Sequence, residues 1–147
     1  MRQILFIVFI SLWFLSSCKK NSDVSELNGS WRLVAVYDKN SAAFSLLPPG
    51  SNMDVIITFF TRNKFAGHTL RNTFTGGTYT QNGNEIIFES FSTTKIAEDQ
   101  WGSSFLTVLY GCPLQSVVPC APSKMIIQGN MMKIVTSLRY DITLVRL

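Results

Sequence analysis

The sequence has few of the residues from which metal and catalytic sites are usually built. Its 147 residues include one histidine, His68, and three cysteines. A tetrahedral zinc site takes four ligands, and no second cysteine pair or histidine pair is present to complete one. A nucleophile activated by His68 would also need an orienting acid, which no spacing in the chain supplies. We therefore expect no metal, no cofactor and no enzymatic activity, with His68 as a surface or hydrogen-bonded residue.

Clustered positive charge is also lacking. The chain carries 13 Lys and Arg residues against 9 Asp and Glu residues, a formal net charge of +4. The basic residues are scattered, whereas nucleic-acid-binding domains usually concentrate them on one face. Gly76-Gly77 precedes no helix, so we interpret it as a turn and not as a phosphate-binding loop. The sequence therefore predicts no nucleic-acid partner.

No apolar run is long enough to cross a membrane. The run from Ile4 to Phe14 has eleven residues, interrupted only by Ser11, whereas a transmembrane helix needs about 20. Arg2 precedes this run and the small residues Ser16-Ser17 follow it. A positive start, a short apolar centre and small residues before a cut are typical of a removable signal peptide. We expect residues 1–17 to be removed.

The tetrapeptide Leu15-Ser16-Ser17-Cys18 resembles the lipobox of bacterial lipoprotein signal peptides, which are cut before the cysteine. The resemblance implies that Cys18 carries acyl chains such as palmitate, and two or three chains would hold the protein on a membrane almost permanently. Residues 18–26 are polar and would form the lipidated cysteine and a short tether. We expect a location in the bacterial cell envelope, lipid-anchored to the outer membrane, on its periplasmic face or at the surface. The alternative is an ordinary secretory signal in which Cys18 has no role.

With Cys18 assigned to lipid, Cys112 and Cys120 remain as a pair. An odd thiol is unusual in an exported protein, and disulfides persist in oxidising compartments. Pro113 and Pro119 lie beside the two cysteines, which is typical of a constrained loop. We predict a disulfide between Cys112 and Cys120 that stabilises the domain by roughly 2–3 kcal/mol. Metal ligation by the two thiols is the alternative.

The rest of the chain, residues 27–147, is predicted to form one domain. Removal of residues 1–17 leaves 130, enough for a single hydrophobic core. Their patterns predict about 7–8 strands joined mostly by short connections. Asn82-Gly83 and Gly129-Asn130 each separate two strand-like runs and mark hairpins. Segment 38–52 is rich in turn residues and is predicted to be a loop.

Two different apolar periodicities predict the first strand and a helix. The strand shows an inward face at period two: Trp31, Leu33, Ala35 and Tyr37. The helix, at about 98–110, shows one apolar face at Trp101, Phe105, Val108 and Leu109, and Gly111 suits a left-handed cap. Five aromatic residues are core candidates first and pocket walls second: Trp31, Phe59, Tyr79, Phe88 and Trp101. We predict a mainly β (α+β) fold, a curved antiparallel sheet or small β-barrel of about 7–8 strands with this one α-helix before the last hairpin.

Short motifs in residues 27–147 resemble META domains, as found in HslJ-type proteins. The opening Leu27-x-Gly29-x-Trp31-x-Leu33 is followed in the expected order by Gly76/Gly77-x-Tyr79, Asn82-Gly83-Asn84-x-Ile86-x-Phe88 and Tyr140-Asp141-Ile142-Thr143-Leu144. Two positions depart from that family, because His68 and Ala97 stand where members often carry cysteine. The resemblance implies an envelope domain of undetermined biochemistry, and it transfers no catalytic residue.

These observations lead us to expect a non-catalytic binding or interaction domain, held at the membrane by lipid and recognising a protein partner. The alternative is a lipocalin-like carrier of a small apolar ligand, since Gly29-Ser30-Trp31 resembles the opening of lipocalins. Lipocalins place their main helix after all eight strands, whereas the helix at 98–110 precedes the last three. An enclosed apolar cavity would favour the ligand carrier, and a filled core would favour the interaction domain.

Overall fold

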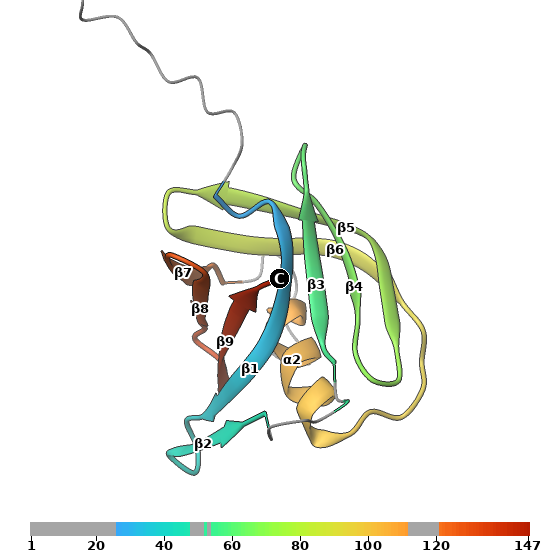
Figure 1. The fold of residues 1–147 in the computed structure, drawn as a ribbon, viewed down its shortest axis with the longest axis vertical. Coiled ribbons are helices and arrows are strands. Elements are labelled where there is room, and N and C mark those ends of the chain that lie inside the picture. Colours follow the sequence, from blue (N-terminus) through green and yellow to red (C-terminus); the bar gives the residue numbers. More distant parts are fainter. Residues whose placement is uncertain (1–25, 48–51, 53, 112–120) are drawn as a thin grey trace, which may run out of the picture.

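The computed structural model describes residues 26–47, 52, 54–111 and 121–147, which form one sheet and one helix (Figure 1). The strands are β1 (Gly29–Asp38), β2 (Ala43–Leu46), β3 (Ile56–Phe60), β4 (Lys64–His68), β5 (Thr73–Asn82), β6 (Glu85–Thr93), β7 (Ser123–Gln128), β8 (Met131–Val135) and β9 (Tyr140–Arg146). The helix, α2 (Gln100–Tyr110), lies between β6 and β7 along the chain. Within these ranges, no helix is long and apolar enough to cross a membrane.

Eight of the strands close into an antiparallel barrel. The order is β1-β3-β4-β5-β6-β7-β8-β9, and β9 pairs back onto β1. The remaining strand, β2, lies outside the barrel order and pairs with the second half of β1. The seam between β6 and β7 is short, with Glu85 opposite Lys124 and Ile86 opposite Ser123. The predicted mainly β fold with a helix before the last hairpin is confirmed, in its barrel form.

A bulge in β1 changes which side chains face the interior. The register of β1 against β9 shifts after Leu33, and an extra residue in one strand reverses the facing of every residue beyond it. Trp31 and Leu33, before the bulge, are fully buried as predicted. Beyond it Val36 is buried, whereas Tyr37 turns to the outer face and lies 4.6 Å from Phe44, centroid to centroid. The predicted inward position of Tyr37 is therefore wrong.

Two segments predicted as a loop and a turn contribute to strands. Strand β2 lies within segment 38–52, where the surrounding turn residues led to the prediction of a loop. Gly76-Gly77 lies inside β5, where the pairing with β6 shifts register between Thr75 and Thr78. Gly76 has a left-handed backbone (φ 64°), and a Cβ on Gly77 would lie 2.6 Å from the Phe65 ring. Gly76 therefore allows a β-bulge and Gly77 allows a close contact with an aromatic ring. The predicted turn at these two residues is not found, because β5 continues through them.

Helix α2 begins two residues later than the predicted 98–110. Asp99 is the N-cap, and its side chain accepts a hydrogen bond from Gly102 N at 2.7 Å. This bond satisfies one of the backbone N–H groups that a helix start leaves free. Gly111 ends the helix in the left-handed conformation, as predicted, with φ 58°.

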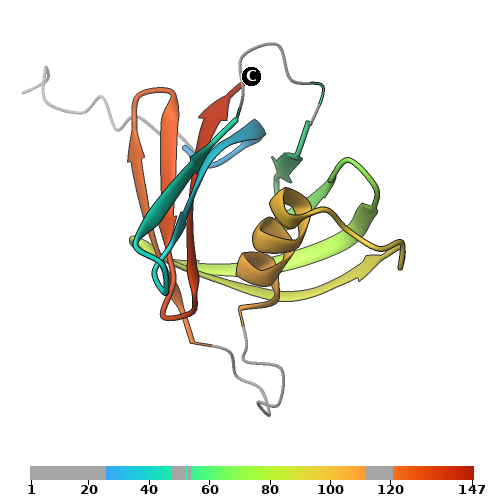
Figure 2. The same cartoon turned by 90° about the horizontal axis from the view of Figure 1, so that it is seen from below.

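The buried face of α2 closes the barrel interior. Phe105, Val108 and Leu109 are at most 1% exposed, and Trp101 is partly buried against the core, as the pattern predicts. Figure 2 shows the helix lying between the β7–β9 side and the β3–β6 side of the sheet. It packs against β9 and β1.

Aromatic side chains fill the interior beneath the helix. Phe65 lies 5.2 Å from Phe88 and 6.3 Å from Phe59, and Phe74 lies 5.9 Å from Phe105, all between ring centroids. These five rings are at most 5% exposed. Interdigitated rings at such spacings form a packed core in this part of the barrel.

The alternating strand directions give the barrel two rims. The N-terminal rim carries the start of β1, the hairpin tips at residues 61–63, 83–84 and 129–130, and the end of β9. The helix rim carries the β1–β2 connection, the turns at 69–72 and 136–139, and segment 94–99 with the start of α2. Strand β1 therefore runs from the N-terminal rim to the helix rim.

Candidate binding cleft on the helix rim

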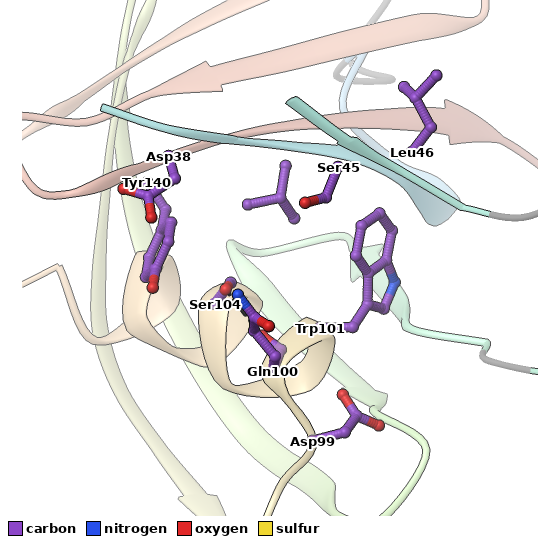
Figure 3. A pocket seen from close by; sticks show the side chains of 9 residues that line it. Asp38, Ser45, Leu46, Asp99, Gln100, Trp101, Ser104 and Tyr140 are labelled. Atoms are coloured by element: carbon purple, nitrogen blue, oxygen red, sulfur yellow. Dashed lines mark hydrogen bonds between the residues drawn. The ribbon is translucent and has the colours of Figure 1, made fainter. Parts of the chain in front are cut away.

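A cleft of about 310 Å³ opens on the helix rim, between α2 and the adjacent ends of β1, β2 and β9 (Figure 3). The sheet contributes Val36, Asp38, Ser45, Leu46 and Tyr140. The helix start contributes Asp99, Gln100, Trp101 and Ser104. Ligand pockets in proteins usually measure about 300–1,000 Å³, so this cleft suits a small ligand or a single large side chain.

The bulge in β1 supplies one wall of the cleft. Beyond the bulge, Val36 and Asp38 face the helix and not the outside. Val36 pairs with Ser45 across β1 and β2, which places both side chains on the same face of the sheet. Without the extra residue, the outward-facing Tyr37 would stand in this wall. The cleft therefore depends on a backbone irregularity.

Asp38 is a charged group of the cleft, and Arg139 binds it. Arg139 Nη2 lies 2.6 Å from Asp38 Oδ2, and Nε lies 2.9 Å from Oδ1. The hydrogen bonds from Arg139 lower the pKa of Asp38 from 3.8 to about 2. A carboxyl with such a pKa stays ionised near neutral pH and is a poor general base. Asp38 and Arg139 therefore form a fixed ion pair at the edge of the cleft.

The helix side presents two buried polar atoms that lack partners within the described part of the chain. They are Asp99 Oδ2, beside the oxygen that caps α2, and Trp101 Nε1. Figure 3 shows both side chains at the first turn of the helix. Buried polar atoms nearly always have a hydrogen-bond partner, and leaving one unsatisfied costs about 1–3 kcal/mol. Both atoms are inaccessible to solvent, so a ligand in the open cleft contacts the ring of Trp101 and not its Nε1.

A polar network behind the cleft holds the start of α2 in place. The Asn72 side chain, 3% exposed, donates to Ile96 O at 2.7 Å and accepts from Ile96 N at 2.8 Å and Thr94 Oγ1 at 2.8 Å. Glu98 Oε1 accepts from Asn72 Nδ2 and from Thr69 Oγ1. These bonds join the turn at 69–72 to the residues that precede the helix. The helix wall of the cleft is therefore preorganised.

The chemistry of this region suits recognition. Among the described residues, no group of three His, Cys, Asp or Glu side chains could hold a metal ion. His68, at the end of β4, is half-buried, with Nδ1 3.3 Å from Thr69 O, and it does not line the cleft. The two carboxylates of the cleft already bind partners, Asp38 at Arg139 and Asp99 at the helix start. What the cleft offers a ligand is apolar contact and hydrogen bonds.

The residues predicted as sites from the sequence are not those of the cleft. Cys18, predicted to carry lipid, lies outside the described residues, as do Cys112 and Cys120, predicted to form a disulfide. Of the residues that line the cleft, the sequence marks only Trp101 as a pocket-wall candidate, and Tyr140 appears there only in the last strand motif of the family resemblance. The lining comes from separate segments, so no local spacing could have identified it.

No protein-family model and no curated protein sequence matches this chain. Two solved structures are similar in fold. One is an NMR structure of a protein from Burkholderia xenovorans, 17% identical, with a TM-score of 0.57 over 82% of this chain and 83% of that one. The other is a crystal structure of a DUF4847-family protein from Bacteroides vulgatus, 15% identical, with a TM-score of 0.56 over 81% of this chain and 92% of that one. At these identities the similarity concerns the fold alone.

Proposed function

We propose that this protein is a bacterial envelope lipoprotein, anchored to the outer membrane through a lipidated Cys18, whose barrel is a non-catalytic binding domain. The cleft on the helix rim carries the proposal, because its space of about 310 Å³ is lined by apolar side chains, among them Val36 and Trp101, together with the polar side chains of Ser45 and Gln100. The anchor is supported by Leu15-Ser16-Ser17-Cys18 and by the polar residues that follow it. The anchor supplies location and the cleft supplies binding.

The anchor and the cleft would lie at opposite ends of the domain. The described chain begins at the N-terminal rim, where Arg146 Nη1 donates to Asn28 O at 2.7 Å and Nη2 donates to Glu26 O. The same guanidinium stacks on the Trp31 ring at 4.3 Å. These contacts hold residues 26–28 on the N-terminal rim, whereas the cleft lies on the helix rim. An anchored domain would therefore present its cleft to the aqueous space.

We favour a peptide or protein partner that inserts one side chain with an apolar face and a hydrogen-bond donor. Val36, Leu46 and Trp101 would contact the apolar part, and the side-chain oxygen of Ser45 or Gln100 would accept the hydrogen bond. Leu46 and its neighbour Phe44 on β2 are 70% and 66% exposed. Leu46 lines the cleft and gives it an exposed apolar edge, whereas Phe44 packs against Tyr37 on the outer face of the sheet.

A carrier of an apolar ligand inside the barrel is less well supported. The space that such a ligand would use beneath α2 is occupied by the packed rings of Phe59, Phe65, Phe74, Phe88 and Phe105. Opening it would break these contacts, at several kcal/mol for a single large core side chain.

We also propose that the domain is META-like. Leu27, Trp31 and Leu33 of the opening motif are fully buried, and Gly29 has φ 121°, which other residues rarely adopt. The resembling positions are therefore ones that the fold itself constrains. This supports an architecture shared with META domains, whereas the proposed binding function rests on the cleft.

The anchor is tested by replacing Cys18 with serine in cells fed an alkyne-tagged fatty acid. We expect the wild type to take up the tag and to sediment with membranes. Cys18→Ser should lose the tag and either leave the membrane fraction or remain unprocessed. Cys112→Ser is the matched control and should keep the tag. A Cys18→Ser protein that is still tagged, processed and membrane-bound would refute the anchor.

The cleft is tested by photocrosslinking in living cells. A photoreactive amino acid at Ser45, inside the cleft, should capture a defined partner, and one at Lys95, outside it, should not. Leu46→Ser removes an exposed apolar side chain that lines the cleft, so it should reduce capture from Ser45 while the domain stays folded. Capture that is unaffected by Leu46→Ser, or equal from both positions, would contradict binding in the cleft.

A further inference from the structure

The N-terminal rim exposes apolar side chains that the core does not use. Phe60 at the end of β3, Met131 at the start of β8 and Leu147 at the C-terminus are 48%, 48% and 60% exposed. Their strands are neighbours, in the order β3, β1, β9 and β8. Leu147 N donates to Ser30 O at 2.9 Å, which places the C-terminus beside the start of β1. The three side chains therefore follow one stretch of the rim.

Exposed basic side chains accompany these apolar ones. Arg62 and Lys64 lie at the tip of the β3–β4 hairpin, where Lys64 pairs with Phe60, and Lys133 follows Met131 on β8. In Figure 1 this tip projects beyond the start of β1. Basic and apolar side chains presented together are typical of surfaces that bind anionic lipid.

The backbone of the tip is unusual for the residues that it carries. Arg62 and Asn63 have left-handed backbones, with φ 61° and 56°. Asparagine adopts this conformation readily, whereas arginine does so at a steric cost that glycine would avoid. Folding alone would favour glycine at position 62. A strained residue at an exposed tip is a reason to look for a function of its side chain.

The length of the tether brings this rim close to the proposed anchor. Glu26 lies eight positions after Cys18 in the sequence, and a chain spans at most about 3.3–3.6 Å per residue. The start of the barrel would therefore lie within about 30 Å of the lipid. Arg146 fixes Glu26 and Asn28 on the N-terminal rim, so this rim is the part of the domain nearest the membrane.

We propose that the N-terminal rim docks onto the anionic surface of the membrane that holds the anchor. Phe60, Arg62 and Lys64 make the contact, with Met131 and Leu147 beside them. This inference rests on the lipid anchor proposed above. The charges on the bilayer attract the two basic side chains, and Phe60 enters the headgroup region.

Acidic side chains on the same rim do not cancel this attraction. Glu26 and Glu85 are exposed there, and Glu85 lies opposite Lys124 in the β6–β7 seam. The tip of the β3–β4 hairpin and the residue after it, residues 61–64, have the sequence Thr-Arg-Asn-Lys, which contains no acidic residue. The tip therefore meets an anionic surface with its own positive charge.

The test uses the mature, lipidated protein reconstituted into vesicles. One set contains phosphatidylglycerol with phosphatidylethanolamine, and the other contains phosphatidylcholine alone. A water-soluble amine reagent labels exposed lysines, and mass spectrometry gives the labelling of Lys64 relative to Lys95 on the helix rim. We expect this ratio to be about fivefold lower in the anionic vesicles, the equivalent of about 1 kcal/mol for one basic residue near the surface.

Two variants separate docking from folding. Arg62→Gly removes the charge and suits the left-handed backbone, so it should melt at the same or a higher temperature yet raise the Lys64 ratio about fivefold in anionic vesicles. Arg71→Gln on the helix rim removes an exposed charge elsewhere and should leave the ratio unchanged.

Flotation with the vesicles measures the anchor separately from docking. A protein that floats but has equal Lys64 labelling in both vesicle types overturns the docking and leaves the anchor standing. A protein that does not float overturns the anchor, and the docking with it. Protection of Lys64 that persists in Arg62→Gly would also contradict the proposed contact, as would protection that disappears in Arg71→Gln.

Discussion

Replacing Phe105 with alanine tests whether the barrel has a filled core. The Phe105 ring is fully buried in the middle of α2, with its centroid 5.9 Å from that of Phe74. Phe→Ala substitutions in packed cores cost about 3–5 kcal/mol, from lost transfer energy and the cavity that remains. A domain of this size is stable by about 5–15 kcal/mol. Phe105→Ala should therefore remove a large part of the stability while leaving the cleft residues in place.

Urea denaturation followed by circular dichroism measures this loss. With a slope of about 2 kcal/mol per molar, the midpoint should fall by roughly 1.5–2.5 M. Ser103→Ala, an exposed change on the same helix, should alter the stability by less than about 0.5 kcal/mol.

An apolar probe distinguishes a filled core from a ligand space. Benzene should raise the midpoint of Phe105→Ala, because a cavity lined by apolar side chains binds such molecules, and should leave the wild type unchanged. A loss below about 1 kcal/mol, or a wild type stabilised by benzene, would refute the packed interior and revive the ligand-carrier hypothesis.

Two further predictions follow from close contacts. In Gly67→Ala the new Cβ would lie 2.0 Å from Ile56 O and 2.5 Å from the Phe74 ring, so β3 and β4 must separate and the melting temperature should fall by an amount equivalent to about 1–3 kcal/mol; an unchanged melting temperature would contradict the close approach of these strands at Gly67. In Arg139→Gln the pKa of Asp38, now about 2, should return toward 3.8 in an NMR titration of the carboxyl carbon. Because the folded pKa is the lower one, the wild-type pair stabilises the fold above about pH 4 and this contribution is lost as the pH falls toward 2; a pKa that stays low in the variant would point to another cause.

Local chemistry explains why the strands and the helix could be predicted from the sequence. Asn82-Gly83 and Gly129-Asn130 favour tight turns wherever they stand between strands, and both connect hairpins in the structure. The helix is marked by Phe105, Val108 and Leu109 on one face and by Gly111 at its end. These signals act within a few residues, so the rest of the fold cannot overrule them easily.

The choice between an open sheet and a closed barrel, and the position of the cleft, could not be decided from the sequence because both depend on pairings between distant residues. The register shift after Leu33 arises where β1 meets β9, more than 100 residues later. Nothing in the alternation of Trp31, Leu33, Ala35 and Tyr37 marks it. The same limit applies to β2, which is a strand because β1 offers it an edge. The cleft is lined by residues of β1 beyond the register shift and by residues of β2. No local sequence pattern could therefore predict it.

Strand β1 also determines how far the cleft would stand from a docked membrane. It has ten residues, and a strand rises about 3.3 Å per residue, so its ends are up to about 30 Å apart. The screening length at physiological salt is about 8 Å. The field of anionic lipids at the N-terminal rim would therefore have decayed before it reached Asp38 and Asp99. Lipid charge should then govern docking strongly and partner binding in the cleft hardly at all, so the two activities can be measured, and can fail, independently.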